Sequence, residues 1–556
     1  MKTRYALPGV FLFLLIAFPW SNSTAQSGHW VVRAEYEDPR MVAQVAEWLE
    51  PWEVHPREGY LVVGVDEAGY ARLEGMGFRV EVDTKLTSEI NQPQRRLPGQ
   101  TSGIPGYPCY RTVDETYAAA QSLAQRYPNL ATWSDIGDSW EKTASIGEPG
   151  DDLWVLRLTN ASLGGAKPKL FVMAALHGRE YATAELVTRF AESLLSNYGI
   201  LPNPTWILDH HEIHLLLQAN PDGRRQAELG LMWRKNTNQN YCAPTSPNRG
   251  ADLNRNFDFL WSCCGGSSAF ACDETYRGSA PASEPEVQAI QAYLRSQFPD
   301  QRGANLDDPA PDDTTGIFVD VHSYGQLVLW PWSFTQQTAP NHSALQTLGR
   351  KLAYFNDYIP QQAIYLYPTD GSSDDFAYGE LGLAAYTIEI GNWFFQSCAD
   401  FEQTIAPTNL QALNYAARVV AAPYQLPSGP DARSVNVQSP IFISATHASL
   451  TAVIDDSRYR SGSGEPVQAI AAAEFYIDTP PWITHTLPIP YAMTVEDGAW
   501  DEPIEQVRAE IELSSLALGR HMLFVRGRDA GGHWGPVTGE FLDLTLPPLY
   551  LPLVIR

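Results

Sequence analysis

A single apolar run that ends in candidate metal ligands constrains this chain more than any other stretch. Residues 170–176 are all apolar, and His177-Gly178-Arg179-Glu180 follows at once. Such a run predicts a strand buried on both faces, as in a parallel sheet, and ligands of such sheets gather at the carboxyl ends of the strands. Imidazole and carboxylate groups bind zinc. Alone, however, the spacing also fits a histidine at the start of a helix beside a surface glutamate.

Length and charge narrow the class of protein. The chain has 556 residues, which predicts two to four domains. Its formal net charge of −26 argues against nucleic acid or an anionic membrane as a partner. We interpret the acidity as a means of staying soluble outside the cell.

The first 25 residues predict a secretory signal peptide. Lys2 and Arg4 precede the apolar stretch 10–18, and the small residues 23–25 precede an expected cut. The alternative is an N-terminal anchor, but the apolar stretch is shorter than the ~20 residues of a membrane span. Because all six cysteines lie in the exported part, we expect disulfides in a secreted, extracellular protein without a transmembrane segment.

Residues 28–98 predict a small α+β unit followed by a linker. The expected strands and helices cover 30–36, 41–49, 59–65, 67–76 and 78–82. The Pro-rich stretch after them carries the dibasic pair Arg95-Arg96, and exposed linkers of this kind are cut by proteases. We interpret the unit as the propeptide of a zymogen, with a plain accessory domain as the alternative.

Residues 106–425 predict the main domain. A capping box at Thr112 and Glu115 starts a helix, and strands then alternate with helices. The expected strands cover 153–158, 170–176, 213–218, 316–321 and 384–390, and later helices cover 184–197 and 283–297. Such alternation predicts an α/β fold in which helices sandwich a mixed, largely parallel sheet.

Residues 435–556 predict a separate β-sandwich of the immunoglobulin or fibronectin kind. Short alternating strands recur at 449–454, 471–477, 507–513 and 521–528, separated by Gly, Pro and Asp clusters. The last residues, 547–556, are apolar. They form either a tail for export or cell-surface association, or a final strand.

Two further residues at apolar strands extend the candidate site. His322 ends one apolar run, and Glu389 lies inside another. A carboxylate buried without a partner is costly, so Glu389 is expected to have a partner or a chemical role. Arg234 and the pair Asn254-Arg255 add cations and an amide, although each alone also fits an ordinary surface or loop residue.

Several short motifs follow one another between residues 107 and 424. They are His-Gly-Arg-Glu at 177–180, Asn-Pro-Asp-Gly at 220–223, Trp-Arg-Lys at 233–235, Asp-Leu-Asn-Arg-Asn at 252–256, Glu-Thr-Tyr-Arg-Gly at 274–278, His-Ser-Tyr at 322–324 and Thr-Ile-Glu at 387–389. In this order they resemble the zinc metallocarboxypeptidases related to pancreatic carboxypeptidases A and B, the funnelin fold. The chain is identified as a secreted, bacterial-type member that acts on the C-termini of peptides or proteins.

The resemblance implies one zinc ion per catalytic domain, held by His177, Glu180 and His322. Zinc lowers the pKa of a bound water toward ~7 and polarises the scissile carbonyl. Glu389 is implied to be the general base, and Arg234 is implied to stabilise the oxyanion of the tetrahedral intermediate.

The resemblance also implies a clamp for the substrate's terminal carboxylate, which makes the enzyme an exopeptidase. Asn254 and Arg255 are implied to grip this carboxylate, and a guanidinium can bind it with two hydrogen bonds. Tyr367 is implied to close over it, and Arg179 to contact an outer subsite. Asp252 is implied to orient a ligating histidine.

Side-chain selectivity is implied by the residues that follow Tyr367. Asp374 falls at the base of the first primed pocket, where an aspartate resembles the B-type enzymes that remove C-terminal Lys or Arg. Ser333 matches the same pattern. Gln362 departs from it, since B-type enzymes have a small residue near that position, and dual selectivity for basic and apolar termini stays open. The alternative role for Asp374 is to cap its loop.

Three smaller features complete the expectations. The resemblance implies a disulfide between Cys242 and Cys272, where pancreatic relatives carry a bridge, and leaves four cysteines unassigned. The run His-His-Glu-Ile-His at 210–214 lacks the His-Glu-x-x-His spacing and is expected to be structural. The acid-rich loop 307–313 offers ligands for Ca²⁺, with a solvated loop as the favoured alternative.

Two competing functions come from other classes of protein. A zinc amidase or deacylase of the same fold, acting on peptidoglycan-type or non-peptide substrates, would need the zinc ligands but not the carboxylate clamp. The presence of Asn254, Arg255 and Tyr367 therefore favours the peptidase. A catalytically inactive binding module would need neither, and the intact ligands and Glu389 argue against it.

Overall fold

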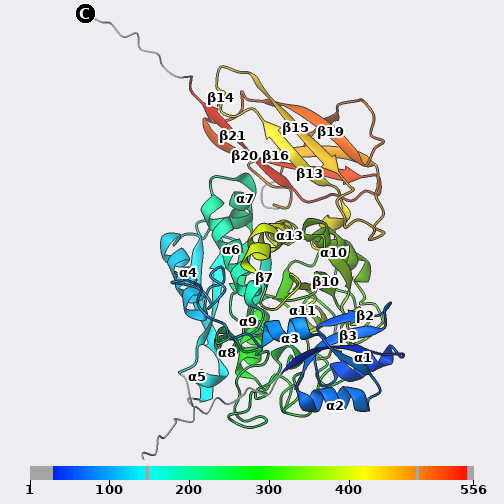
Figure 1. Cartoon of the computed structure of the whole chain (residues 1–556). Coiled ribbons are helices and arrows are strands. Elements are labelled where there is room, and N and C mark those ends of the chain that lie inside the picture. Colours follow the sequence, from blue (N-terminus) through cyan, green and yellow to red (C-terminus); the bar gives the residue numbers. More distant parts are fainter. Residues whose placement is uncertain (1–28, 145–148, 484–487, 548–556) are drawn as a thin grey trace, which may run out of the picture.

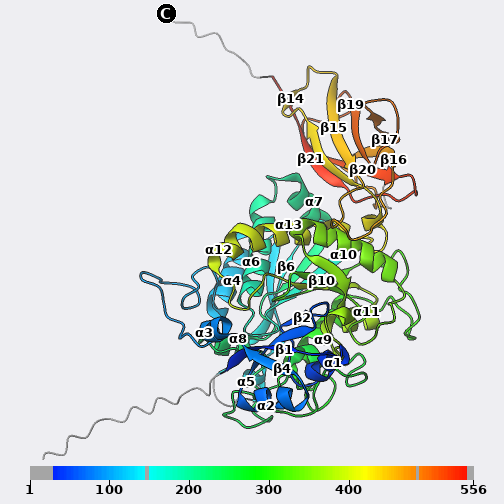
Figure 2. The same cartoon turned by 45° about the vertical axis from the view of Figure 1, so that its right-hand side comes forward.

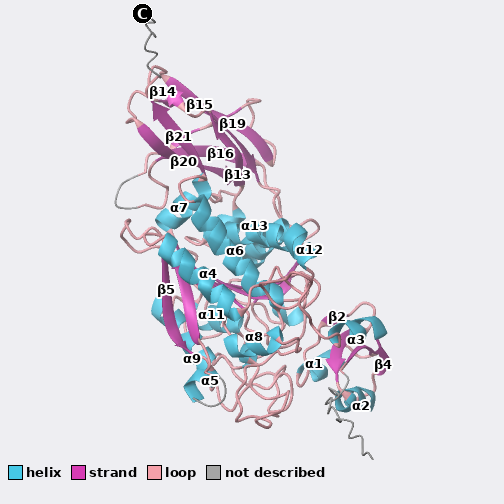
Figure 3. Cartoon of the chain, turned by 60° about the vertical axis from the view of Figure 1, so that its left-hand side comes forward, coloured by secondary structure: helices cyan, strands magenta, loops and turns pink. Residues whose placement is uncertain are grey.

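The computed structural model describes residues 29–144, 149–483 and 488–547. The expected signal peptide and almost all of the apolar tail lie outside these residues. The described chain forms an N-terminal domain (30–90), a central domain (104–428) and a β-sandwich (431–545). The N-terminal domain and the β-sandwich contact different ends of the central domain (Figures 1 and 3). Among the described residues, no helix is long and apolar enough to cross a membrane.

The N-terminal domain is a four-stranded antiparallel sheet, ordered β2-β3-β1-β4, with three helices. Its elements are β1 (Trp30–Glu35), α1 (Arg40–Ala46), β2 (Glu53–His55), β3 (Tyr60–Val65), α2 (Glu67–Gly75), β4 (Arg79–Val82) and α3 (Thr84–Ile90). Asp66 and Asp83 cap α2 and α3 by accepting hydrogen bonds from the backbone of Gly69 and Leu86. The sequence did not predict β2 and α3, because both are too short for a clear periodic pattern.

The central domain is built on an eight-stranded mixed sheet, so the expected fold class is confirmed. The sheet order is β11-β10-β12-β9-β7-β8-β6-β5. The strands are β5 (Ala131–Asp138), β6 (Asp152–Leu158), β7 (Lys169–Ala174), β8 (Glu212–Leu216), β9 (Ile317–His322), β10 (Leu327–Trp330), β11 (Ile359–Gln362) and β12 (Ala384–Glu389).

Helices flank this sheet (Figure 2). They are α4 (Val113–Arg126), α5 (Trp140–Ala144), α6 (Tyr181–Asn197), α7 (Pro202–His210), α8 (Pro221–Glu228), α9 (Pro285–Gln297), α10 (His342–Asn356), α11 (Ser373–Leu381), α12 (Cys398–Asp400) and α13 (Ala406–Val419). The capping box at the start of α4 is present, since Thr112 and Glu115 each accept a hydrogen bond from the other's backbone.

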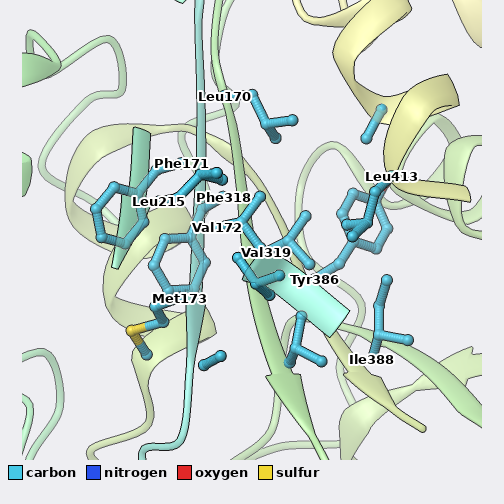
Figure 4. Close-up of a cluster of buried hydrophobic side chains, with 14 of the residues drawn as sticks. Leu170, Phe171, Val172, Met173, Leu215, Phe318, Val319, Tyr386, Ile388 and Leu413 are labelled. Carbon is cyan, nitrogen blue, oxygen red and sulfur yellow. The ribbon is translucent and has the colours of Figure 1, made fainter. Parts of the chain in front are cut away.

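The core of the central domain lies where the parallel strands β8, β7, β9 and β12 run side by side (Figure 4). Phe171 on β7 stacks on Phe318 on β9, with the ring centroids 5.8 Å apart. Both rings are fully buried, as are Val172 and Val319 beside them. Burial of both faces explains why these strands read as unbroken apolar runs.

The chain leaves the sheet just before the first candidate ligand. β7 ends at Ala174, two residues earlier than the apolar run predicts, because Ala175 has a φ of 55° and turns the backbone. This left-handed conformation is unfavourable for alanine, and it ends the strand before His177. The expected strand over 170–176 was therefore too long at its carboxyl end.

The β-sandwich has a four-stranded sheet, β13-β15-β19-β18, and a five-stranded sheet, β14-β21-β20-β16-β17. Its strands are β13 (Asp431–Val437), β14 (Ile441–Phe442), β15 (His447–Asp455), β16 (Ile470–Ile477), β17 (Tyr491–Ala492), β18 (Thr494–Val495), β19 (Ile504–Glu512), β20 (Gly519–Asp529) and β21 (Thr538–Thr545). Its own apolar core lies between the sheets. β15, β16, β19 and β20 match the expected strands, whereas the sequence did not predict β13, β14, β17, β18 and β21.

All six cysteines are paired. The expected disulfide Cys242–Cys272 is confirmed. Cys109 pairs with Cys398, which joins the start of the central domain to α12, and the neighbours Cys263 and Cys264 pair with each other. The last two bonds were not assigned from the sequence.

Candidate active site

Three buried side chains meet beyond the carboxyl ends of β7 and β9. His177 follows β7, Glu180 precedes α6, and His322 is the last residue of β9. Glu180 Oε1 lies 2.7 Å from His177 Nδ1, and Glu180 Oε2 lies 3.2 Å from His322 Nδ1. The ligand atoms of all three residues lie within 4.8 Å of one another. Two imidazoles and one carboxylate are a donor set suited to zinc, with a position left open.

The far side of each imidazole ring faces a carboxylate. His177 Nε2 lies 3.2 Å from Asp252 Oδ1, and His322 Nε2 lies 2.8 Å from Asp320 Oδ2. Such outer carboxylates fix the ring orientation of metal-binding histidines. Asp252 was expected to do this, whereas Asp320 was missed. Its signal was visible, since it is a carboxylate inside an apolar strand, two residues before a histidine.

Arg234 contacts both Asp252 and His177, and it lines the cavity next to the three candidate ligands. Its Nε donates to Asp252 Oδ2 at 2.9 Å, and its Nη1 lies 3.3 Å from His177 Nδ1. Burial would raise the pKa of Asp252, but the charges of Arg234 and Arg255 outweigh it and hold that pKa well below its usual range. Asp252 therefore stays ionised beside His177.

Glu389 ends β12 next to the metal-ligand group. In the parallel pairing of β12 and β9 it lies opposite His322. It also lines the same cavity as His177, Arg234 and His322. Burial raises the pKa of the Glu389 carboxyl, although the charge of His322 opposes this shift. A carboxyl with a raised pKa is a better proton acceptor when it is ionised.

The expected clamp residues lie on the other side of this cavity. Arg255 is buried; its Nε donates to Gly266 O at 2.8 Å and its Nη1 to Asn254 O at 2.7 Å. Its Nη2 has no hydrogen-bond partner. Asn254 Oδ1 accepts from the backbone N–H of Ser373, and Tyr367 lines the cavity beside them. The structure thus brings Asn254, Arg255 and Tyr367 together.

Asp374 and Ser333 also line this cavity, which has a volume of about 40 Å³. Asp374 Oδ1 accepts hydrogen bonds from the Ser372 hydroxyl at 2.8 Å and from the backbone N–H of Asp375 at 3.0 Å. Burial raises the pKa of Asp374, because these neutral donors only partly replace water. Gln362 is turned away, since its Nε2 donates to the backbone carbonyls of 332, 335 and 337.

The N-terminal domain places a carboxylate, that of Glu50, in the active-site cavity. Glu50 forms ion pairs with Arg179 and Arg234, and Tyr367 donates its hydroxyl to Glu50 Oε1 at 3.3 Å. Burial would raise the pKa of Glu50, but the charges of Arg234 and Arg179 outweigh it and lower that pKa. Arg179 also pairs with Glu274 at 2.7 Å. Sequence reasoning missed Glu50, because nothing local marks a contact across more than 100 residues.

The remaining candidates have structural partners or no supporting group. His211 Nδ1 lies 2.9 Å from Ala417 O, and His214 Nδ1 lies 2.7 Å from the Tyr293 hydroxyl. In the acidic loop, Asp308 accepts two hydrogen bonds from Asn305. Across the described ranges, the group of three or more potential metal ligands is that of His177, Glu180 and His322, so the suggestion of Ca²⁺ gains no support.

The comparison with known families agrees with this geometry. The family model described as zinc carboxypeptidase matches residues 116–413, more than half of the chain. The chain belongs to the zinc carboxypeptidase family. It is therefore a metal-dependent exopeptidase, as the motifs predicted, and the family uses zinc.

Relatives in this family carry both A-type and B-type names. A zinc carboxypeptidase from Saccharothrix mutabilis subsp. capreolus is 30% identical over 336 residues, which cover 57% of this chain and 71% of the relative. Carboxypeptidase B2 of Bos taurus is 27% identical over 328 residues, covering 57% and 70%. Carboxypeptidase A4 of Mus musculus is 28% identical over 332 residues, covering 58% and 72%. These relatives do not distinguish between the two selectivities.

Solved structures show the same fold. The crystal structure of thrombin activatable fibrinolysis inhibitor matches with a TM-score of 0.55 at 24% identity and covers 71% of this chain and 99% of that one. Carboxypeptidase A from Helicoverpa armigera matches with a TM-score of 0.56 at 22% identity, covering 71% and 98%. At this identity the likeness concerns the fold alone.

Proposed function

We propose that this chain is a secreted zinc carboxypeptidase that removes C-terminal Lys or Arg after its N-terminal domain is released. One observation carries the substrate class: a guanidinium with an unpartnered Nη2 and a buried carboxylate line the same cavity beside the metal-ligand group. The guanidinium of Arg255 suits a terminal carboxylate, and the carboxylate of Asp374 suits a basic side chain. The signal-like first residues and three disulfides support secretion.

His177, Glu180 and His322 would hold the zinc ion. When bound, zinc supplies a water of lowered pKa and polarises the scissile carbonyl. Asp252 and Asp320 would keep the two imidazole rings in the orientation in which Nδ1 faces the centre. Both histidine ligands would then be presented by the nitrogen that lies near Glu180.

Glu389 would take a proton from the attacking water and pass it to the leaving amine. Arg234 would stabilise the oxyanion, because its guanidinium is already fixed by Asp252 and lies beside His177. In the present arrangement Glu50 occupies the Nη1 donor of Arg234. That donor becomes available to the substrate only when the N-terminal domain leaves.

Arg255 and Asn254 would bind the terminal carboxylate, and Tyr367 would cover it. A pocket closed behind this carboxylate admits a chain end but not the middle of a chain. This supports an exopeptidase over an amidase or deacylase, which would have no need of the clamp. Arg179 would contact a more distant part of the peptide once Glu50 is removed.

Asp374 would set the preference for basic side chains. A substrate ending in Lys or Arg supplies a cation to this buried carboxylate and forms a charge-assisted hydrogen bond. A substrate ending in Phe leaves the carboxylate unpaired, at a cost of ~1–3 kcal/mol. The expected preference for basic ends is therefore roughly tenfold to hundredfold in kcat/KM.

The test compares matched peptides ending in Arg and Phe with the cut, zinc-loaded enzyme and its Asp374→Ile variant. We expect the parent to prefer Arg and the variant to prefer Phe, because an apolar floor removes the unpaired charge. Glu389→Gln serves as the inactive control, with zinc retained and most of kcat lost. Equal values for the parent, or an unchanged ratio in the variant, would show that Asp374 does not set selectivity.

The N-terminal domain is proposed to act as an inhibitory propeptide. Glu50 fills the position next to Arg179 and Arg234 that a peptide would need. Arg95 and Arg96 in the linker are exposed. A trypsin-like endopeptidase could therefore cut the linker and allow the domain to dissociate.

A further inference from the structure

Residues 263–267 form a turn, the cysteine turn, that lies behind the substrate clamp. Cys263 and Cys264 are neighbours in sequence and are joined by a disulfide. This bond closes a small ring that contains the peptide bond between them. Both cysteines are exposed, whereas Gly266 and Ser267 after them are buried. The inward side of the turn contacts two segments that line the active-site cavity.

The first of these segments, residues 367–374, is held through Asp370. One carboxylate oxygen of Asp370 accepts hydrogen bonds from the backbone N–H of Cys264 at 2.9 Å and of Gly265 at 3.2 Å. The other oxygen accepts one from the Ser267 hydroxyl. Asp370 is 1% exposed, so its charge depends on these donors for stabilisation. In sequence Asp370 lies between Tyr367 and Asp374, both of which line the active-site cavity.

The second segment carries Arg255. Gly266 O accepts the hydrogen bond from Arg255 Nε at 2.8 Å, which fixes the plane of the guanidinium. Gly266 has a φ of +86°, and a Cβ there would lie 1.9 Å from the carbonyl oxygen of Pro368. No side chain fits at this point, so the turn packs directly on residues 367–374.

We propose that the cysteine turn and Asp370 are positioning elements that hold Arg255 and residues 367–374 ready for the substrate's terminal carboxylate. The inference rests on the proposed role of Arg255 as the carboxylate clamp. Because the ring limits the backbone freedom of Cys264, its N–H stays directed at Asp370 before substrate binds. Without the ring, carboxylate capture has to order the turn, and affinity for the carboxylate falls.

The test measures inhibition constants of a substrate analogue that has a free terminal carboxylate and of its C-terminal amide. The proteins are the full chain cut at its linker, the double variant Cys263→Ser/Cys264→Ser, and Asp370→Asn. In the parent we expect the acid to bind at least tenfold more tightly than the amide. In both variants we expect the acid to weaken by about tenfold and the amide to stay within about twofold. KM should rise for peptides, while kcat changes by less than about threefold.

Cys109→Ser/Cys398→Ser is the matched control, because it also removes a disulfide, but one that ties the start of the central domain to α12 rather than supporting the clamp. We expect it to lower Tm and to leave the ratio of acid to amide affinity unchanged. Ser267→Ala provides a milder variant should Asp370→Asn fail to fold. An unchanged ratio in the cysteine-turn variants, or an equal loss in the control, would overturn the inference. A parent that binds acid and amide equally would instead contradict the proposed clamp itself.

Discussion

The two small domains contact the central domain through opposite kinds of interface. The N-terminal domain reaches the active-site cavity with a carboxylate, Glu50, that pairs with Arg179 and Arg234, the two arginines proposed to contact the substrate. The β-sandwich meets helices α7, α10 and α13 on the side of the molecule away from the N-terminal domain (Figure 1). There Trp482 packs on Trp206 and His211, with centroids 5.5 and 5.8 Å apart. Between α10 and β13, Lys351 pairs with Asp431, and both side chains are fully buried.

The difference between the two interfaces indicates which of the two domains can dissociate from the central domain. The charged groups that the N-terminal domain covers have a proposed second use in substrate binding, and an exposed linker joins that domain to the rest. The groups that the β-sandwich covers are aromatic rings and an ion pair that would be costly to expose or to separate. We infer that the first interface is temporary and the second permanent, and four measurements test this contrast.

The largest expected effect is that of separating each domain from the enzyme. Cutting the linker at Arg95 or Arg96 and removing the N-terminal domain should raise kcat/KM by roughly a thousandfold, equivalent to about 4 kcal/mol. Truncation of the chain after residue 428 should give no increase and should lower solubility or Tm. Activity on a short peptide, before and after size-exclusion chromatography, measures both. If the uncut chain were as active as the cut one, the N-terminal domain would not be inhibitory, and the contrast between the two interfaces would be wrong.

Next in size is the loss of the buried ion pair. Lys351→Met should lower the free energy of unfolding by up to about 3 kcal/mol, because it removes one of the two cations that pair with the buried Asp431 and leaves Arg458, 3.5 Å away, as the other. Arg520→Ala is the control. Arg520 crosses the same interface, but its pair with Asp543 is exposed, so we expect about 1 kcal/mol or less. Calorimetry should show the loss without a change in kcat/KM.

A smaller effect is expected at the temporary interface. Glu50→Gln removes the charge that pairs with Arg179 and Arg234, and it should weaken docking of the N-terminal domain by about 2 kcal/mol, or roughly thirtyfold. The uncut variant should therefore show activity that the uncut parent lacks. Glu74→Gln, on the exposed face of α2, is the control and should behave like the parent. Equal activity of the two uncut variants would show that Glu50 does not hold the domain.

The last effect is a dependence of stability on pH in the β-sandwich, which is the smallest change for a single step of the quantity varied. Burial raises the pKa of Asp456 from 3.8 to about 7. Since the folded state favours the protonated form, this stability is fully present below about pH 4 and is lost as pH rises through about 7. We expect a slope of about 1 kcal/mol per pH unit, which Asp456→Asn should remove. Thermal unfolding between pH 4 and 8 measures it, and parallel curves for parent and variant would contradict it.

Much of the site was visible in the sequence, because its residues follow local patterns. The apolar strands that end near His177 and His322 could be predicted from hydrophobicity, since both faces of these strands are buried. The proximity of His177 and His322 also follows, because neighbouring parallel strands end at the same edge of the sheet. The capping box before α4 depends on residues only three positions apart.

The rest depends on contacts between distant segments. Glu50 lies in a short connection with no periodic pattern, and its partners are more than 100 residues away. The pairing of neighbouring Cys263 and Cys264 could not be chosen, because six cysteines allow fifteen arrangements. The short strand β10 was missed since four apolar residues before a proline do not distinguish a strand from a turn.

The disulfide between Cys109 and Cys398 affects what happens when a protease cuts the central domain. It ties the first residues of the central domain to a point beyond β12, so it encloses His177, His322 and Glu389 in one covalent loop. If an endopeptidase releases the N-terminal domain as proposed, the same endopeptidase will also make misplaced cuts. A single nick inside this loop leaves both fragments attached, and the nicked molecule keeps its mass until a reducing agent opens the bond. Damage to this enzyme would therefore stay hidden on a non-reducing gel.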